Sequence, residues 1–505
     1  MSGIFAPSLL PEMNFLNKIQ AVFEKYPGRN AMCIKDTYYT YSSFASKIAA
    51  IQHDIEEDSG NEQRIGIIVS DDVETYASIL AVLLSGKTYI PIHPNYPAER
   101  IAQIIEQAQL KIILAKAGEN FHLSIPVTDT TSIPPENNPD ITMPVASLAE
   151  RNAYILFTSG STGIPKGVPI SYFNLDSFVA AFYALGYELS ENDRFLQMFD
   201  LTFDLSVMSY LIPFCLGACV YTIPESGMKY TNVYHVLETY NITIALMVPS
   251  ILSYLRAYFS EIRLPHLRYS LFCGEALYKD IVKEWMECVP NAAIDNVYGP
   301  TEATIFCLAY KINNGGDIPD YNGIVTVGKP MRGMDAIVVD DNLNPSDDKE
   351  KGELCLYGKQ LTAGYLDPER TKEAFFEHNG EKYYRTGDIV FKDAHGNFMY
   401  CGRVDHQVKI QGFRVELSEI EFHLRKITGI ANVVALDISA ANGISQVYAV
   451  FEGEKSDTGM MMEELKTKLP VYMIPSQVYF VPSFPLNANG KIDRNALRKI
   501  ITSLV

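Results

Sequence analysis

The strongest constraint on the fold comes from residues 158–167, which read TSGSTGIPKG and directly follow the apolar run Tyr154–Phe157. A short apolar run bounded by a glycine-rich turn predicts a buried strand followed by a loop. Glycines let the backbone approach a ligand closely, and Lys166 adds a positive charge suited to a phosphate oxygen. We therefore predict a phosphate-binding loop whose donors come from Thr158, Ser159, Gly160, Ser161, Thr162, Gly163 and Lys166.

The order of residues in this loop excludes the commonest nucleotide-binding patterns. A Walker A loop ends in G-K-[ST], whereas this loop ends in G-I-P-K-G. No GxGxxG follows a predicted strand, so a dinucleotide-dependent enzyme has no support either.

Apolar runs alternate with amphipathic segments along most of the chain, which is typical of an α/β protein. Arg64–Val69, Lys111–Ala115 and Ile244–Val248 are predicted strands, and Glu74–Leu84 has helical periodicity. At 505 residues, the chain exceeds what one hydrophobic core supports, so more than one domain is expected.

The last hundred residues have a different pattern. A strand is predicted at Gln407–Ile410, a turn at Gly412, and a helix at Glu416–Ile427 with Gly429 as its C-cap. We therefore predict a large domain over 1–404 and a small α+β domain over 405–505.

Composition narrows the class of protein. The formal net charge of −18 argues against broad binding to nucleic acid or to anionic membranes. The eight cysteines form no CxxC pair, and Cys215 and Cys219 lie in an apolar run that predicts buried free thiols. The N-terminus lacks the pattern of a secretion signal, and Val207–Ile223 is too short to span a membrane. A soluble, cytoplasmic protein is expected.

Further motifs follow the loop in a fixed order and make the chain resemble the adenylate-forming superfamily, which includes acyl-CoA synthetases, luciferases and adenylation domains of nonribosomal peptide synthesis. The stretches that carry this resemblance are Leu83–Pro94, Asn296–Glu302, Lys351–Leu366, Tyr384–Asp388, Gly402–Glu421, Leu469–Pro475 and Asn489–Arg494. The resemblance implies an α/β fold with mixed sheets sandwiched by helices in a multi-subdomain N-terminal domain. It also implies ATP and Mg²⁺ as cofactors.

The resemblance assigns the reacting end of ATP to three residues. Lys491 would bridge the carboxylate and the α-phosphate, Thr301 would contact the α-phosphate, and Glu302 would bind Mg²⁺. Joining two anions requires such neutralisation of charge, and Mg²⁺ prefers oxygen ligands. Without the resemblance, Lys491 would be read as a solvated surface lysine.

The nucleoside end of ATP is assigned in the same way. Tyr298 would stack on adenine, the amide of Asn296 would meet the adenine edge, and Gly299 belongs to the same motif. Asp388 would accept the ribose hydroxyls, with Arg403 adding a contact to ribose or phosphate. A structural salt bridge is the alternative for Asp388 and Arg403.

Asp405 matches the family's hinge, about which members rotate the small domain between adenylation and thioester formation. Gly412 would then face the incoming pantetheine thiol. Residue 411 is Gln where many relatives carry Arg, a departure that bears on carrier or nucleotide contacts.

Asp204 discriminates between substrates, because amino-acid-activating members place an aspartate here against the substrate's α-ammonium group. The alternative for Asp204 is a helix N-cap. The other matched pocket positions are apolar: Leu205, Met208, Leu246, Leu271, Cys273, Val297, Ile305 and Phe306. A small amino acid follows, with D-alanine favoured because the chain further resembles the D-alanine–carrier protein ligase branch, in which the cysteine matching Cys273 abuts the substrate's α-carbon. As the alternative, Cys273 is a small core residue.

The chain ends fourteen residues after Lys491, so we expect a freestanding ligase that acts on a separate phosphopantetheinylated carrier protein. Arg425 and Lys426 are the nearest candidates for a basic docking patch. The alternatives are a ligase for another small amino acid, an acyl-CoA synthetase of the same fold, and a degenerate nucleotide-binding module.

Overall fold

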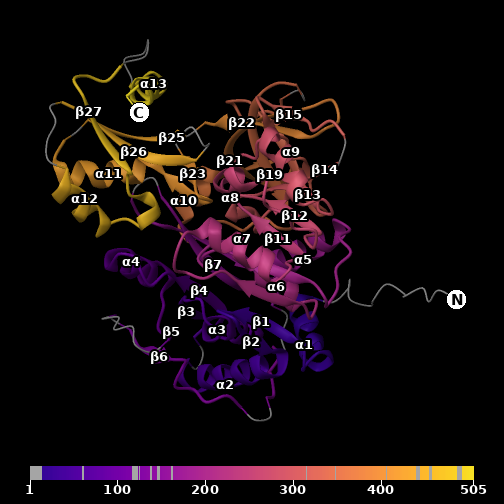
Figure 1. Ribbon diagram of the computed structural model, residues 1–505. Helices are drawn as coiled ribbons and strands as arrows, with labels where there is room; N and C mark the ends of the chain where they lie inside the picture. Colours follow the sequence, from indigo (N-terminus) through magenta and orange to yellow (C-terminus); the bar gives the residue numbers. More distant parts are fainter. Residues whose placement is uncertain are drawn as a thin grey trace.

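The computed structural model describes residues 14–59, 62–116, 123, 125–136, 139–144, 148–160, 163–313, 316–346, 349–404, 407–430, 432–439, 444–453, 458–485 and 492–504. Figure 1 shows the large domain running from indigo to orange, with the small C-terminal domain in yellow packed at one side. No helix among these residues is both long enough and apolar enough to cross a membrane.

The first sheet of the large domain has the strand order β6-β5-β3-β4-β7-β8 and is parallel except for the β7–β8 pair. Its strands are β3 (Arg64–Ile68), β4 (Thr88–Ile92), β5 (Ile113–Ala115), β6 (Val127–Asp129), β7 (Asn152–Thr158) and β8 (Lys166–Ser171). The predicted strands at Arg64–Val69 and Tyr154–Phe157 are thus confirmed.

The second sheet has the order β17-β14-β13-β12-β11-β9-β10-β1-β2. Its strands are β1 (Asn30–Ile34), β2 (Thr37–Thr40), β9 (Arg194–Gln197), β10 (Cys219–Thr222), β11 (Ile244–Met247), β12 (Tyr269–Phe272), β13 (Ala293–Tyr298), β14 (Leu308–Ile312) and β17 (Lys329–Pro330). Central strands such as β11 are buried along their whole length, which explains their uninterrupted apolar sequence.

Helices cover these sheets and meet between them (Figure 1). They are α1 (Phe15–Lys25), α2 (Tyr41–Ser59), α3 (Val73–Leu84), α4 (Ala98–Ala108), α5 (Tyr172–Ala184), α6 (Asp204–Phe214), α7 (Lys229–Thr239), α8 (Pro249–Leu255) and α9 (Lys279–Cys288). Short 3-10 turns follow at η2 (Arg256–Tyr258) and η3 (Thr301–Ala303). The mixed sheets and their helices confirm the expected α/β class.

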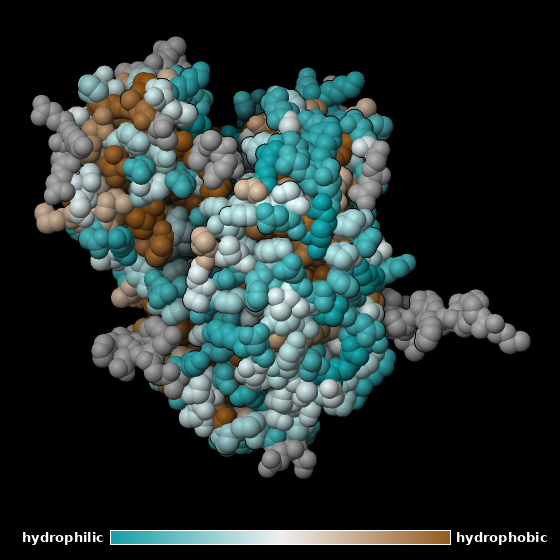
Figure 2. Space-filling view, in the orientation of Figure 1, coloured by the Kyte–Doolittle hydropathy of each residue, from teal (hydrophilic) through white to brown (hydrophobic). Residues whose placement is uncertain are grey.

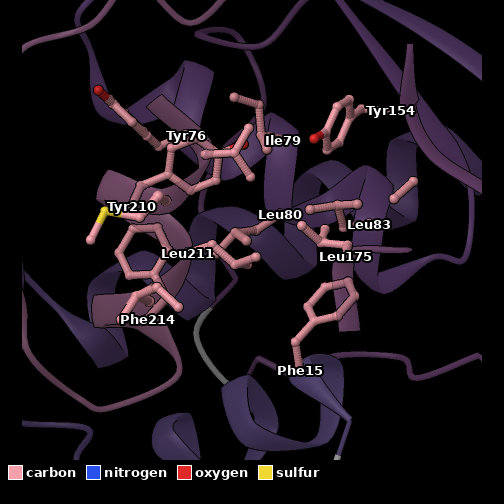
Figure 3. Packing of buried hydrophobic residues seen from close by; sticks show 14 of the residues in the cluster. Phe15, Tyr76, Ile79, Leu80, Leu83, Tyr154, Leu175, Tyr210, Leu211 and Phe214 are labelled. Carbon is pink, nitrogen blue, oxygen red and sulfur yellow. The ribbon is translucent and has the colours of Figure 1, made fainter. Parts of the chain in front are cut away.

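The main core joins α3, α5 and α6 to the strands around them. Figure 3 shows Tyr76, Ile79, Leu80 and Leu83 of α3 packed beside Tyr210, Leu211 and Phe214 of α6. Apolar residues surround α3 on all sides, and Asp72 caps its first turn by accepting a hydrogen bond from the Thr75 amide at 2.8 Å. This close packing fixes the start of α6, where Asp204 lies.

A third, smaller part of the large domain is antiparallel. It contains β15 (Asp320–Tyr321), β16 (Ile324–Val325), β18 (Met334–Val339), β19 (Gly352–Gly358), β20 (Phe375–His378), β21 (Glu381–Lys392), β22 (Phe398–Arg403) and α10 (Pro368–Ala374). The β21–β22 pair aligns Asp388 with Arg403.

The small domain consists of the hairpin β23 (Gln407–Ile410) and β24 (Phe413–Glu416), then α11 (Leu417–Thr428) and further elements. These are β25 (Val433–Ser439), β26 (Ser445–Glu452), α12 (Gly459–Lys466), η4 (Val471–Met473), β27 (Gln477–Val481) and α13 (Arg494–Thr502). Gly429 caps α11 with φ +69°, as predicted. The predicted division of the chain falls at residues 404–405, and residues 405 and 406 lie outside the described part, so that boundary stays a prediction.

Candidate adenylate-forming site

The loop after β7 returns into β8, with Thr158 paired to Lys166 in the antiparallel register. Gly163 has φ +77°, which favours glycine, and its amide donates to the Gly160 carbonyl at 3.0 Å. The loop residues Thr158, Ser159, Gly160, Gly163 and Lys166 therefore lie together, while Ser161 and Thr162 lie outside the described residues.

The small domain supplies anions to the donors of this loop. The Lys166 ammonium contacts Glu416 Oε1 at 2.9 Å, and the Gly160 amide donates to Glu419 Oε2 at 3.1 Å. The Ser159 hydroxyl donates to the Arg414 carbonyl at 2.8 Å. In this arrangement the Gly160 amide and the Lys166 ammonium meet carboxylates, the same kind of oxygen anion that a phosphate would present.

Glu302 lies in η3 and is fully buried. Its carboxylate accepts from Arg414 Nη1 at 2.9 Å and from the Tyr365 hydroxyl at 2.6 Å. Burial alone would raise the pKa of Glu302, but the Arg414 charge and the Tyr365 hydrogen bond bring it below its ordinary value. Glu302 is therefore a carboxylate, the form that binds a metal ion.

A cavity of about 740 Å³ contains the residues expected to hold the nucleoside, among them Asn296, Tyr298, Asp388 and Arg403. Arg403 Nη1 contacts Asp388 Oδ1 at 2.6 Å, and the Tyr298 hydroxyl donates to the other oxygen of Asp388. Asn296 Nδ2 donates to the Thr326 carbonyl at 2.9 Å, which fixes the orientation of the amide. The ion pair proposed as an alternative for Asp388 and Arg403 therefore exists, and it lies inside the cavity.

Gly299 shows how tightly this region is built. A Cβ on Gly299 would come within 2.4 Å of the Phe306 backbone, so no other residue fits without moving the chain. This close contact holds the motif Asn296–Glu302 against the apolar residues that follow it.

Asp204 is the first residue of α6 and is 6% exposed. Burial raises the pKa of Asp204 to about 7, and a hydrogen bond from Thr301 offsets this in part. Its Oδ2 atom has no hydrogen-bond partner among the described residues. The N-cap of α6 is Phe203, so the alternative of a helix N-cap for Asp204 is wrong.

The apolar positions predicted around Asp204 come together in one core cluster, which includes Leu205, Met208, Leu246, Leu271, Cys273, Val297, Ile305 and Phe306. They come from α6, from β11, β12 and β13, from the position directly after β12 in the case of Cys273, and from the segment after η3. Burial raises the pKa of the Cys273 thiol to about 12, so this sulfur is an apolar surface and not a nucleophile.

The similarity of this chain to known proteins extends over most of its length. The family model described as AMP-binding enzyme matches residues 19–366. The chain belongs to the AMP-binding enzyme family.

Its relatives within the family include whole ligases and parts of much longer synthetases. A D-alanine–D-alanyl carrier protein ligase from Bacillus mycoides is 31% identical over 513 residues, covering 97% of this chain and 100% of the relative. A linear gramicidin synthase from Brevibacillus parabrevis is 32% identical over 490 residues, covering 94% of this chain, but this chain spans only 9% of its length.

Solved structures agree with this family. The adenylation domain AlmE of Vibrio cholerae, in complex with glycyl-adenosine-5'-phosphate, has a TM-score of 0.86 at 28% identity, with 100% of both chains covered. Holo-PA1221, which contains adenylation and carrier domains, has a TM-score of 0.83 at 24% identity. The match covers 97% of this chain and 84% of the PA1221 chain, and at this identity it supports the fold alone.

Two expected features of an AMP-binding enzyme lie outside the described residues, namely Lys491 and the hinge residue Asp405. Their roles stay predictions. The described residues contain no group of three or more His, Cys, Asp or Glu side chains arranged to hold a metal ion, so Glu302 would be a lone protein carboxylate.

Sequence reasoning missed the partners that the small domain supplies, including Arg414, Glu416 and Glu419. All three lie within the recognised stretch Gly402–Glu421, so the motif was visible. Their partners were not, because Arg414 and Glu302 are 112 residues apart and Gly160 and Glu419 are 259 apart.

Proposed function

We propose that this protein activates a small amino acid with ATP, releasing pyrophosphate, and then transfers the aminoacyl group to the phosphopantetheine thiol of a carrier protein. The observation that carries the proposal is the Asp204 carboxylate, which is buried with one unpartnered oxygen. Such a group is costly unless a cation meets it, and the α-ammonium group of an amino acid is a cation of the right size. A fatty acid or aryl acid would leave it unpaired.

D-alanine is the leading substrate. The positions predicted to surround Asp204 are apolar and several are bulky, which favours a short side chain without charge. D-alanine–D-alanyl carrier protein ligases match the chain over nearly its whole length, and the similar AlmE domain was solved with a glycyl adenylate. Both support a small amino acid.

Magnesium fits the site beside ATP. Glu302 is an ionised, buried carboxylate that now neutralises the Arg414 guanidinium, so a cation already occupies the place that Mg²⁺ would take. When bound, Mg²⁺ would neutralise the phosphates and hold them in line. Glu302 would hold Mg²⁺ only if Arg414 withdrew, because both cations would use the same carboxylate.

The contacts between the two domains suggest how the half-reactions are divided. With Glu416 on Lys166 and Glu419 on Gly160, the loop cannot also hold the β- and γ-phosphates of ATP. We assign this arrangement to thioester transfer, after pyrophosphate has left. Adenylation would use the other orientation, reached about Asp405, in which Lys491 of the domain 405–505 meets the carboxylate and α-phosphate in the core formed by 1–404.

In the transfer step, the thiol sulfur attacks the carbonyl carbon of the aminoacyl-adenylate. The new C–S bond forms, the bond between the acyl carbon and the phosphate oxygen breaks, AMP leaves, and the thiol proton passes to solvent. ATP use and eight free cysteines favour the cytoplasm as the location of this chemistry.

The test is ATP–pyrophosphate exchange with D-alanine, L-alanine, glycine, serine and short fatty acids. We expect exchange with D-alanine first and none with fatty acids. Exchange with another small amino acid would revise the substrate, exchange with fatty acids alone would establish an acyl-CoA synthetase, and no exchange with any acid would support a degenerate module.

A further inference from the structure

The tip of the hairpin β23–β24 lies between the nucleotide cavity and a second cavity of about 830 Å³, and Gln411 lines both. The second cavity lies between the domains, with walls from the large domain and from β26 and η4 of the small domain. Val471, which lines it, is 79% exposed, and Figure 2 shows apolar side chains gathered over the small domain. The second cavity therefore opens to the surface beside apolar groups.

The hairpin tip also reaches the amino-acid pocket. The Gly412 amide donates to Glu275 Oε1 at 2.8 Å, and a Cβ on Gly274 would lie 3.8 Å from the Gly412 Cα. Gly274 follows Cys273, one of the residues grouped around Asp204. A thiol that enters along the second cavity would thus arrive at the amino-acid pocket past Gly412.

Acidic side chains outnumber basic ones in the lining of the second cavity. Its carboxylates belong to Asp71, Asp200 and Glu225, and of the described residues that line it Lys229 is the only Lys or Arg. His93 pairs with Asp200 at 3.1 Å. The hairpin adds no charge at its tip, because residue 411 is Gln.

Lys229 begins α7 and makes no ion pair within 4.0 Å among the described residues. Its side chain is exposed at the cavity, and desolvation by nearby protein atoms lowers its pKa, while Asp200 and Glu275 act in the opposite direction. The loop before it is fixed, since Asn232 Nδ2 donates to the carbonyls of Pro224 at 2.9 Å and Ser226 at 2.7 Å. Lys229 therefore follows a fixed loop, lines the second cavity and has no ion-pair partner within 4.0 Å among the described residues.

We propose that Lys229 binds the phosphate of the phosphopantetheine arm, and that the acidic lining around it selects an arm with one phosphate over coenzyme A. A phosphodiester on a carrier protein brings one negative charge, which Lys229 can meet. Coenzyme A brings a diphosphate and a further phosphate monoester, and the carboxylates of Asp71, Asp200 and Glu225 would repel the excess. The inference rests on the proposed function and adds which residue would recognise the acceptor of its second step.

The test compares three thiols as acceptors for the preformed aminoacyl-adenylate: pantetheine, 4'-phosphopantetheine and coenzyme A. For the unchanged protein we expect a KM for phosphopantetheine about tenfold below those for pantetheine and coenzyme A, the size of one charge-assisted contact. Lys229→Met should raise the KM for phosphopantetheine to that of pantetheine and leave the KM for pantetheine as it was. Lys229→Arg should restore the preference, and Lys372→Met, an exposed lysine outside both cavities, should retain it.

Equal KM values for pantetheine and phosphopantetheine in the unchanged protein would overturn the inference, as would an equal rise in both for Lys229→Met. A preference for coenzyme A over phosphopantetheine would overturn the selection by charge. These outcomes are distinct from failure of the proposed function, which would show as absent ATP–pyrophosphate exchange in the unchanged protein.

Discussion

The amino-acid pocket and the phosphate site differ in how they are built. The positions predicted for the amino-acid pocket come from the large domain alone, and the apolar ones form part of one continuous core. At the phosphate site, donors from the large domain meet Arg414, Glu416 and Glu419 from the small domain. We therefore expect packing within the large domain to determine the choice of substrate, and the position of the small domain to determine phosphate binding.

The largest effect is expected from Lys491→Ala. If the lysine serves only adenylation, exchange should fall by about 10²–10³-fold, the usual effect of removing one group that stabilises developing charge. Transfer from a preformed adenylate to pantetheine should continue. Both rates can be followed by quenched-flow assay of AMP and thioester.

Loss of both adenylation and transfer would contradict the proposal that each step uses its own orientation of the small domain. Lys499→Ala, in the last turn of α13, is the matched control and should leave both rates as they are.

Asp204→Ala tests the rigid pocket. The change removes the anion that meets the α-ammonium group, so kcat/KM for the amino acid in exchange should fall by about 10²-fold. The KM for ATP should change less than the KM for the amino acid, because Asp204 does not line the nucleotide cavity and meets the predicted phosphate residues only through Thr301. A larger effect on ATP than on the amino acid would show that Asp204 acts on the phosphate site.

The raised pKa of Asp204 predicts that the free energy of unfolding depends on pH. Since burial raises the pKa of Asp204 from 3.8 to about 7, the folded protein binds a proton that the unfolded chain releases. The free energy of unfolding should therefore fall as pH rises between these values, by an amount on the order of 4 kcal/mol. Asp204→Asn should flatten this slope in urea unfolding measured from pH 4 to 7, and an unchanged slope would contradict the assignment.

A smaller effect is expected at the contact between the domains. Glu419→Gln leaves the buried Arg100 without its ion pair, which lies at 3.0 Å, so the described arrangement becomes less stable. Transfer to pantetheine should slow by about tenfold, while exchange persists. In contrast, Lys468→Met removes an exposed pair with Glu99 and should change transfer less than about threefold.

The smallest effect is expected from Gln411→Arg. A cation at the boundary of the two cavities should lower the KM for coenzyme A by about threefold, because it offsets part of the acidic lining. Acceptor assays at low and high salt would check this, and a gain that survives high salt would contradict an electrostatic cause.

The sequence predicted local structure where the signal is local. The strand before residue 158, the turn at Gly412 and the helix that ends at Gly429 follow from periodicity and glycine placement, and the structure confirms them. Motif resemblance also predicted that Cys273 and Phe306 lie together, and both belong to the same core cluster, while their role toward a substrate stays a prediction.

What the sequence did not predict are contacts set by domain orientation. The same motif residue, Arg414, would meet different partners in another orientation, so no periodicity determines its contact with Glu302. Lys229 was missed for a related reason, since its cavity exists only where the two domains meet and nothing in the adjacent sequence marks it.

Nucleotide phosphates and the small-domain carboxylates of Glu416 and Glu419 should exclude each other from the phosphate site. Hydrogen exchange at the amides of Gly160 and Gly412, with and without a non-hydrolysable Mg·ATP analogue, tests it most directly. In the described arrangement the Gly160 amide donates to Glu419 and the Gly412 amide donates to Glu275. The analogue should therefore lower the protection of the Gly412 amide from exchange, whereas the amino acid alone should leave it unchanged. If the analogue saturates the protein and the protection of Gly412 stays unchanged, nucleotide phosphates and the small domain can be present at the site together, and the proposed exclusion is wrong.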